Sequence, residues 1–132
     1  MFAEVSEMER TVLHCDCNSF FASFETVAHP EYSKVPMAVC GSVENRHGIV
    51  LAKNEFAKKA GVSTGEVIWK AKQKCPSLLV VHPTYGLYSQ YSEAVNSIYY
   101  EYTDRIEPFG IDESWLDVTG SYKLFGDGRR IA

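Results

Sequence analysis

The sequence predicts an α+β fold, in which short apolar strands and amphipathic helices follow one another along the chain. Three observations support this prediction. Alternating apolar runs occur near both ends of the chain, a stripe of aromatic residues recurs at helical spacing in the second half, and 45% of the 132 residues are apolar. A chain of this length and composition can bury a globular core, which argues against disorder.

The first predicted strand covers residues 11–17 and ends at an acid. Its alternation places Asp16 on the face opposite a layer of apolar side chains, Leu13, Cys15 and Cys17. A helix over residues 19–28 should follow, because Asn18 is a suitable N-cap and phenylalanines recur behind it at helical spacing. A strand that delivers a carboxylate and then opens a helix suits phosphate binding, since N–H groups of the first helical turn can hold phosphate oxygens.

The pattern in the middle of the chain predicts a small region of mixed helices and strands, bounded by His29-Pro30 and Pro83. Its expected elements are strands at 36–40 and 49–52 joined by a turn at 41–48, helices at 54–60 and 66–74, and a strand at 78–81.

A long amphipathic helix is predicted over residues 85–103, with one stripe formed by Tyr88, Tyr91, Val95, Ile98, Tyr99 and Tyr102. An antiparallel hairpin of strands 105–109 and 114–118 should follow, and its connection at 110–113 presents Asp112 and Glu113. Adjacent strand residues point to opposite faces, so these two acids can serve one ion cluster only if a turn or bulge follows Gly110. Residues 125–132 look like the opening of a helix that stops, which suggests a fragment.

Charge is distributed unevenly around a net value of −4. Residues 51–75 carry six lysines against two glutamates, a local charge of +4 that leaves −8 on the remainder. A basic lobe beside an acidic lobe suits a polyphosphate substrate, although lysines solvated on helix faces explain the same pattern. The overall acidity alone argues against nucleic acid as a partner.

Cysteine and histidine spacing gives little support to a zinc site. The four cysteines show no C-x-x-C pattern and read as reduced core thiols, and the four histidines are scattered. The opening segment MFAEVSEMER lacks the basic and apolar parts of a leader, and the longest aliphatic runs are too short to span a bilayer. These features predict a cytoplasmic protein with no membrane partner.

The two acidic spots, Asp16 and Asp112-Glu113, lie where apolar strands meet turns. If the two strands are neighbours, the acids converge into an oxygen-rich site of the kind that holds Mg²⁺ beside substrate phosphates, which predicts phosphoryl transfer. Read singly, Asp16 is a turn or helix-capping acid, and Asp112 and Glu113 form an ordinary hairpin tip.

The segments DCNSFFASFE, GIVLAKNEFAKKAGV and GIDESWLDV, in that order, resemble the Y-family translesion DNA polymerases, the DinB/UmuC-like group. The resemblance covers nearly the whole chain from about residue 11. It implies a partial palm with an antiparallel sheet and packed helices, residues 11–19 and 84–132, and a small α/β fingers subdomain, residues 20–83. The later palm segment, the thumb and the little finger would be absent from this chain.

The resemblance also implies a set of site residues. Asp16 and Asp112 would bridge two Mg²⁺ ions, with Mn²⁺ as a possible substitute, Glu113 would complete the site near the primer 3′-hydroxyl, and the carbonyl of Cys17 would be a further ligand. Phe21 matches the steric-gate position, where a bulky ring excludes a 2′-hydroxyl. Phe20 matches the neighbouring aromatic, and the backbone N–H groups of both phenylalanines would face the triphosphate. The residue pattern alone assigns both rings to the core, and for Phe20 the core remains the favoured role.

The chain departs from the family pattern in the fingers. A Thr, a Tyr and an Arg usually contact the triphosphate, and Ala52, Glu55 and Lys58 stand in their places. Lys58 still offers a point charge to a phosphate, without the bidentate fork of arginine. Glu55 would repel a triphosphate unless it pairs with Lys58 or Lys59, both within helical reach.

The function implied by the resemblance is template-directed DNA synthesis of the error-prone lesion-bypass type, as in DNA repair and an SOS-like damage response. The full-length protein would bind primer–template DNA and a dNTP and contact a sliding clamp outside this chain, and this fragment alone should be inactive. Two alternatives stay open: a noncatalytic polymerase-like module that binds protein or DNA, favoured by the altered 52–58 segment, and another palm-fold enzyme such as a nucleotide cyclase.

Overall fold

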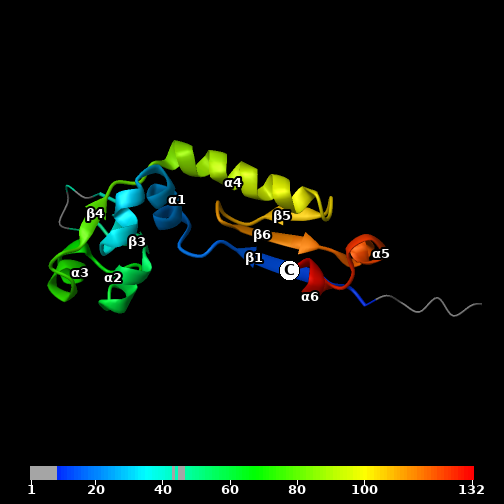
Figure 1. The fold of residues 1–132 in the computed structure, drawn as a ribbon, viewed down its shortest axis with the longest axis horizontal. Coiled ribbons are helices and arrows are strands. Elements are labelled where there is room, and N and C mark those ends of the chain that lie inside the picture. Colours follow the sequence, from blue (N-terminus) through cyan, green and yellow to red (C-terminus); the bar gives the residue numbers. More distant parts are fainter. Residues whose placement is uncertain (1–8, 43, 45–46) are drawn as a thin grey trace, which may run out of the picture. The chain divides into compact units, whose positions relative to one another are not determined.

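The computed structural model describes residues 9–42, 44 and 47–132 (Figure 1). The predicted turn at 41–48 and the acidic opening segment therefore lie partly outside the described residues. The chain divides into two compact units. We call Met1–Cys17 with Gln90–Ala132 the split unit and Asn18–Ser89 the middle unit. Helices and strands are mixed in both, so the predicted α+β class is confirmed.

The sheet of the split unit is antiparallel and has the order β1-β6-β5 (Figure 1). Its strands are β1 (Val12–Asp16), β5 (Ile106–Pro108) and β6 (Glu113–Asp117), close to the predicted ranges. In the register of β1 and β6, Asp16 lies opposite Glu113 and His14 lies opposite Trp115. Strands far apart in the sequence thus bring the two predicted acidic spots to the same end of one sheet.

The two faces of this sheet differ in burial. Ser114 and Leu116 of β6 are buried, and Ser114 Oγ donates a hydrogen bond to Asn96 Oδ1 of helix α4 (Tyr85–Tyr100) at 2.7 Å. The opposite face carries His14 and Trp115, both exposed. Among the described residues, the side chains of β1 and β6 that point away from Ser114 and Leu116 are more exposed to solvent, and we call this side of the sheet the open face.

Three short elements close the split unit after β6: η2 (Thr119–Ser121), α5 (Tyr122–Phe125) and α6 (Gly128–Ile131). The last matches the helix opening expected at the C-terminal end. Asp127 is its N-cap, because its carboxylate accepts a hydrogen bond from the backbone N–H of Arg130 at 2.9 Å.

The middle unit contains a second sheet with the order β3-β2-β4, in which β2 pairs antiparallel with β3 and parallel with β4. Every residue of the central strand is fully buried, as expected of an apolar run covered on both faces. The elements are α1 (Phe20–Ala28), η1 (Pro30–Lys34), β2 (Met37–Cys40), β3 (Val50–Lys53), α2 (Glu55–Lys59), α3 (Ile68–Lys74) and β4 (Leu79–Val81).

Two local predictions were wrong. Asn18 is not the N-cap of α1: Ser19 occupies that position with φ 50°, and its side chain makes no capping hydrogen bond. Ile98 does not belong to the buried stripe of α4, because it is 55% exposed whereas Tyr88 is fully buried. The helix also ends at Tyr100, earlier than the apolar spacing suggested.

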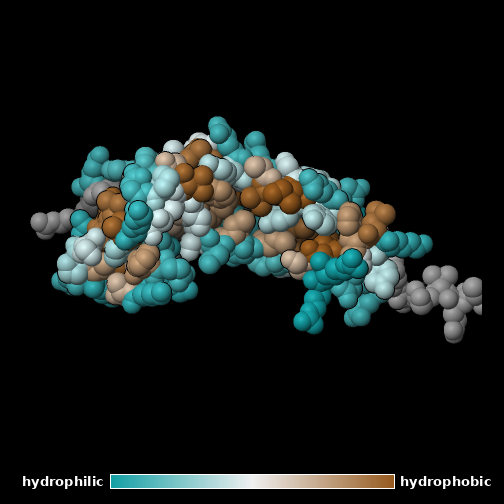
Figure 2. All heavy atoms as spheres, viewed as in Figure 1, coloured by the Kyte–Doolittle hydropathy of each residue, from teal (hydrophilic) through white to brown (hydrophobic). Residues whose placement is uncertain are grey.

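Several large apolar side chains stay on the surface, and Figure 2 shows brown patches among the hydrophilic teal ones. Leu124 is 80% exposed and Phe109, next to the acidic hairpin tip, is 62% exposed. Within the residues that the structure describes, none of the helices combines the length and the apolarity required to cross a bilayer.

Candidate active site

Asp16 and Glu113 are cross-strand partners at the end of the split unit's sheet. Asp16 is the last residue of β1 and Glu113 the first residue of β6, and alternation puts both side chains on the open face. The Cβ atoms of directly opposed strand residues are about 4.5–5.5 Å apart. The backbone therefore brings these two carboxylates within reach of a common ligand.

Asp112 lies just before β6, in the connection between β5 and β6. Gly110 adopts φ 83° in this connection, a left-handed conformation that glycine tolerates best. The carbonyl of Asp112 accepts a hydrogen bond from the Cys17 N–H at 2.9 Å, which ties the hairpin tip to the end of β1. Because Asp112 is outside the strand, it does not have to point away from Glu113.

The carboxylates of Asp112 and Glu113 adjoin the same small space above Gly110. A Cβ atom placed on Gly110 would lie 3.8 Å from Asp112 Oδ1 and 3.8 Å from Glu113 Oε2. Glycine leaves that space open, so two carboxylate oxygens border one position. This arrangement removes the conflict that strict strand alternation would have imposed on two adjacent acids.

His14 is the neighbour of Glu113 that spacing alone had left without a role. Its Nε2 lies 3.2 Å from Glu113 Oε1, and its ring stacks on the indole of Trp115 with centroids 4.3 Å apart. The strand alternation that places Asp16 on the open face places His14 there as well, but it did not indicate the contact of His14 with Glu113.

The chemistry of the donor set fits a hard divalent cation. Three carboxylates and the carbonyl of Cys17 are oxygen donors of the type that Mg²⁺ prefers. In the described part of the chain, however, no three acidic, histidine or cysteine side chains stand close enough to form a ready-made metal cluster. The backbone positions suit a metal site, and the side chains of Asp16, Asp112 and Glu113 would have to converge on the ion.

The thiols near this site are poor metal ligands. Burial raises the pKa values of the Cys15 and Cys17 thiols, and hydrogen bonding to Tyr99 opposes that rise only in part. In the middle unit, separate from this site, burial raises the pKa of the Cys40 thiol to about 11. Metal binding requires the thiolate, so these cysteines favour their neutral form at neutral pH, in line with the predicted structural role.

The two phenylalanines predicted at the nucleotide differ in burial. Phe20 is 3% exposed and packs edge-on against Phe24, with centroids 4.6 Å apart, so it is a core residue. Phe21 is half-buried and stacks on Tyr88 with centroids 4.4 Å apart and an interplanar angle of 13°. The hydroxyl of Tyr88 in turn donates a hydrogen bond to the buried Glu25 carboxylate.

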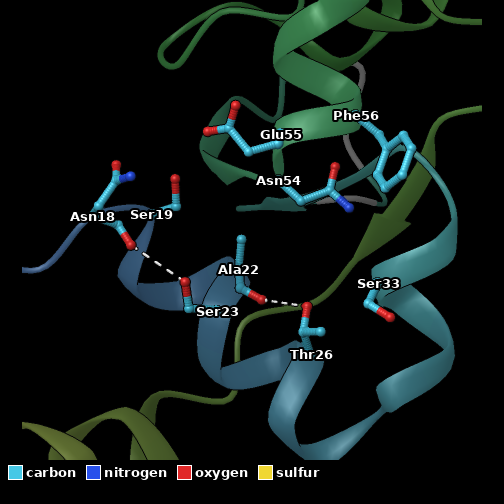
Figure 3. Close-up of a pocket in the computed structure, with 9 residues that line it drawn as sticks. All are labelled: Asn18, Ser19, Ala22, Ser23, Thr26, Ser33, Asn54, Glu55 and Phe56. Atoms are coloured by element: carbon cyan, nitrogen blue, oxygen red, sulfur yellow. Dashed lines mark hydrogen bonds between the residues drawn. The ribbon is translucent and has the colours of Figure 1, made fainter.

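A pocket of about 410 Å³ lies in the middle unit, at the start of α1 and of α2 (Figure 3). Polar groups on its walls include Asn18, Ser19, Ser23 and Glu55. Figure 3 shows the Glu55 carboxylate from α2 and the Asn18 and Ser19 side chains reaching into the same space. Its volume falls in the range of small-molecule sites. Most of its lining residues belong to the segments DCNSFFASFE and GIVLAKNEFAKKAGV, which carried the resemblance in the sequence.

The structure shows the surroundings of Ala52, Glu55 and Lys58, the residues that depart from the family pattern. Glu55 Oε1 lies 3.8 Å from Lys58 Nζ, the pairing that would limit repulsion of an anion. Both side chains are more than half exposed, so the pair is worth little in stability. Ala52 is buried in a core cluster with Ala22, Met37 and Val39, and its methyl group has no polar contact to offer.

A family model described as impB/mucB/samB matches residues 15–132 of the sequence. The chain belongs to the impB/mucB/samB family. DNA polymerase IV of Acetivibrio thermocellus is 58% identical over 125 residues, which are 95% of this chain and 31% of that protein. A DNA polymerase IV of Halalkalibacterium halodurans is 46% identical over the same shares.

The fold of this family member also matches solved structures. A Y-family DNA polymerase chimera superposes with a TM-score of 0.80 at 34% identity, over 90% of this chain and 35% of the chimera. The predicted resemblance to Y-family polymerases is therefore confirmed, and the chain spans about a third of the length of these relatives. The assignment of particular residues to palm and fingers stays a prediction.

Proposed function

We propose that this chain supplies the carboxylate site and part of the nucleotide site of a template-directed DNA polymerase of the error-prone lesion-bypass type. The observation that carries the proposal is the placement of Asp16 opposite Glu113, with Asp112 beside Glu113 above Gly110. Membership of the impB/mucB/samB family and the likeness to DNA polymerase IV support it.

Asp16 and Asp112 would bridge two Mg²⁺ ions, and Glu113 and the Cys17 carbonyl would complete the ligand set. Bound there, such ions would supply charge neutralisation for the triphosphate and the leaving pyrophosphate and would favour ionisation of the primer 3′-hydroxyl. The contribution of this chain is to hold the backbone positions of the three acids together at one end of the sheet, so that only their side chains have to converge when the ions and substrates arrive.

Residues of the middle unit would act on the incoming dNTP. Phe21, fixed by its stack on Tyr88, would exclude a 2′-hydroxyl by contact, which is the role of a steric gate. Lys58 would attract a phosphate as a point charge once it is released from Glu55. The backbone N–H groups of Phe20 and Phe21 open α1, where they can face phosphate oxygens.

The remaining partners would be met by the longer protein. Primer–template DNA, the dNTP and a sliding clamp outside this chain are the expected partners, and the cytoplasm is the expected location. The net charge of −4 on these residues suggests that most DNA-binding surface lies elsewhere. The chain by itself should therefore bind primed DNA poorly and incorporate little or no nucleotide.

A noncatalytic polymerase-like module is the second candidate. It is favoured by the lack, among the described residues, of a preassembled three-ligand metal cluster and by Ala52, Glu55 and Lys58 in place of the usual triphosphate contacts. Such a module would bind protein or DNA without needing Asp16, Asp112 or Glu113, so substitution of these acids separates the two candidates.

The test is primer extension by the full-length protein that carries this chain, with Asp112→Asn compared with the parent. We expect incorporation to fall by about a hundredfold or more, because the substitution removes a negative charge that would hold the metal ions, and these ions would stabilise the charge of the transition state. Asp104→Asn, the same change at an exposed acid before β5, is the matched control and should keep parental activity. Unchanged incorporation by Asp112→Asn with DNA binding retained would rule out the polymerase proposal.

A further inference from the structure

His14 and Glu113 are bound to each other on the open face of the split unit's sheet, through His14 Nε2 and Glu113 Oε1. We propose that His14 is a positioning residue for Glu113. Its imidazole holds one carboxylate oxygen of Glu113 and thereby turns the other oxygen toward the space shared with Asp112. The inference rests on the proposed metal-binding role of these acids and adds a residue that the ligand set does not contain.

The two oxygens of Glu113 have different surroundings. Oε1 lies 3.2 Å from His14 Nε2, and Oε2 lies 3.8 Å from the position of a Cβ on Gly110, as does Asp112 Oδ1. A carboxylate oxygen only accepts hydrogen bonds, so His14 Nε2 carries the hydrogen and donates it. The oxygen that remains available to a cation is the one already directed at the neighbouring acid.

Trp115 holds the imidazole in place. Trp115 is the cross-strand partner of His14, and the two rings stack with an interplanar angle of 22°. An unsupported side chain at an exposed strand position would populate several rotamers, and a stacked ring populates fewer. The orientation of the His14 ring thus follows from β-sheet register. Its hydrogen bond to Glu113 in turn restricts the orientation of the Glu113 carboxylate.

If the Glu113 side chain is already restrained before the cation arrives, the affinity of the site for the cation should be higher. A glutamate side chain loses rotamer freedom when it binds a metal, and that loss weakens binding. A side chain already held near the productive geometry loses less, so the same contacts give tighter binding. His14 therefore acts through Glu113 and need not touch the metal or any substrate.

The experiment measures Mn²⁺ binding to the 132-residue chain by quenching of Trp115 fluorescence. The chain has two tryptophans, so Trp69→Phe leaves Trp115 as the sole reporter. Mn²⁺ alone is titrated into the millimolar range, because a site without substrate phosphates binds metal weakly. Two substitutions separate the effects: His14→Phe keeps a ring for stacking and removes the donor, and His14→Gln keeps a donor and removes the ring.

We expect His14→Phe to weaken Mn²⁺ binding by about three- to tenfold, the loss that corresponds to one hydrogen bond. His14→Gln should lie between the parent and His14→Phe. Val12→Ala is the matched control, because Val12 is exposed on the same face of β1, at the other end of the strand from Asp16. Parental affinity in His14→Phe, or tighter binding by His14→Phe than by His14→Gln, would overturn the inference.

Asp112→Asn distinguishes failure of this inference from failure of the proposed function. Quenching that Asp112→Asn abolishes but His14→Phe leaves unchanged contradicts only the role of His14. Quenching that does not depend on Asp112, or no saturable quenching of the parent, contradicts the metal site and the role of His14 together. Circular dichroism and thermal unfolding of each variant show that the fold is retained.

Discussion

The hydroxyl of Tyr88 in α4 donates a hydrogen bond to the carboxylate of Glu25 in α1, and both residues are buried. The same tyrosine ring stacks on Phe21. Burial, together with this hydrogen bond, raises the pKa of Tyr88 well above its ordinary range, so the hydroxyl stays protonated and remains a donor. One side chain thus links a buried acid to the predicted steric gate.

Tyr88→Phe should destabilise the chain by about 1–3 kcal/mol, because it removes a donor from a buried carboxylate while keeping the ring. Thermal or urea unfolding measures the change. Tyr85→Phe is the control, since Tyr85 is on the same helix and 56% exposed. A loss of stability no larger than that of Tyr85→Phe would show that the buried hydrogen bond contributes nothing.

Phe21→Val in the full-length protein should raise incorporation of ribonucleotides relative to deoxynucleotides by about tenfold or more, because a smaller side chain no longer blocks a 2′-hydroxyl. Primer extension with each nucleotide type gives the ratio. Phe24→Val is the same substitution three residues later in α1. If both variants change the ratio equally, loosening of the helix rather than loss of the gate explains the effect.

Gly110→Ala should lower the free energy of unfolding by about 1–2 kcal/mol, since φ 83° disfavours any residue with a Cβ atom. The space above Gly110 would accept the methyl group, because its nearest contacts are at 3.8 Å. Gly120→Ala is the comparison, at a glycine without positive φ and with open space around it, and it should cost nothing. Equal stability of the two variants would contradict the strain argument.

Asn54→Ala should cost about 2–3 kcal/mol, because Asn54 does more than cap α2. Its Oδ1 accepts from the N–H groups of Ala57 and Met37, and its Nδ2 donates to the carbonyl of Val35 at 2.8 Å. Asn54→Asp keeps the acceptor and loses the donor, so its stability should lie between that of the parent and Asn54→Ala. Urea unfolding of the three proteins tests this order.

The carboxyl group of Asp117 should make the stability of the fold depend on pH. Hydrogen bonds from Thr119, and then the nearby Arg10, hold the pKa of Asp117 below its ordinary value of 3.8. A carboxyl group whose pKa is lower in the folded state stabilises the fold at pH values above the ordinary pKa of that group. This stabilisation is lost as the pH falls through the pKa of the folded state. Asp117→Asn should therefore be less stable than the parent by about 1 kcal/mol at neutral pH.

The difference between Asp117→Asn and the parent should shrink once the pH falls below 3.8, as the parent carboxylate becomes protonated. Melting temperatures of both proteins across acidic and neutral pH give the two curves. A constant difference at every pH would mean that the charge of Asp117 is irrelevant and that only its shape matters.

Strand and helix positions in this chain follow from local patterns, and the details that depend on neighbours do not. Alternation located β1 and β6, and the ends of these strands placed Asp16 and Glu113 correctly near the two turns. The cap of α1 was misplaced, because a side chain suited to capping does not reveal which residue takes the left-handed backbone. Ile98 was assigned to the core because periodicity shows which residues share a face of the helix, but not whether another element covers that part of the face.

The supporting residues of the candidate site were hardest to find from the sequence. Register sets His14 beside Trp115 and lets its Nε2 reach Glu113, and register depends on pairing between strands about a hundred residues apart. The link from Glu25 to Tyr88 likewise joins positions 63 residues apart. Such contacts carry no periodic signal, because each involves one side chain at one position.

The start of β6 immediately after Asp112 makes the length of the β5–β6 connection critical. An inserted or deleted residue that the connection did not absorb would shift β6 by one position against β1, and every side chain of the strand would change faces. Glu113 would then turn toward α4 and Ser114 toward solvent. Surface connections usually tolerate changes in length, but a change in this one keeps Glu113 opposite Asp16 only if the residues between Pro108 and Glu113 absorb it.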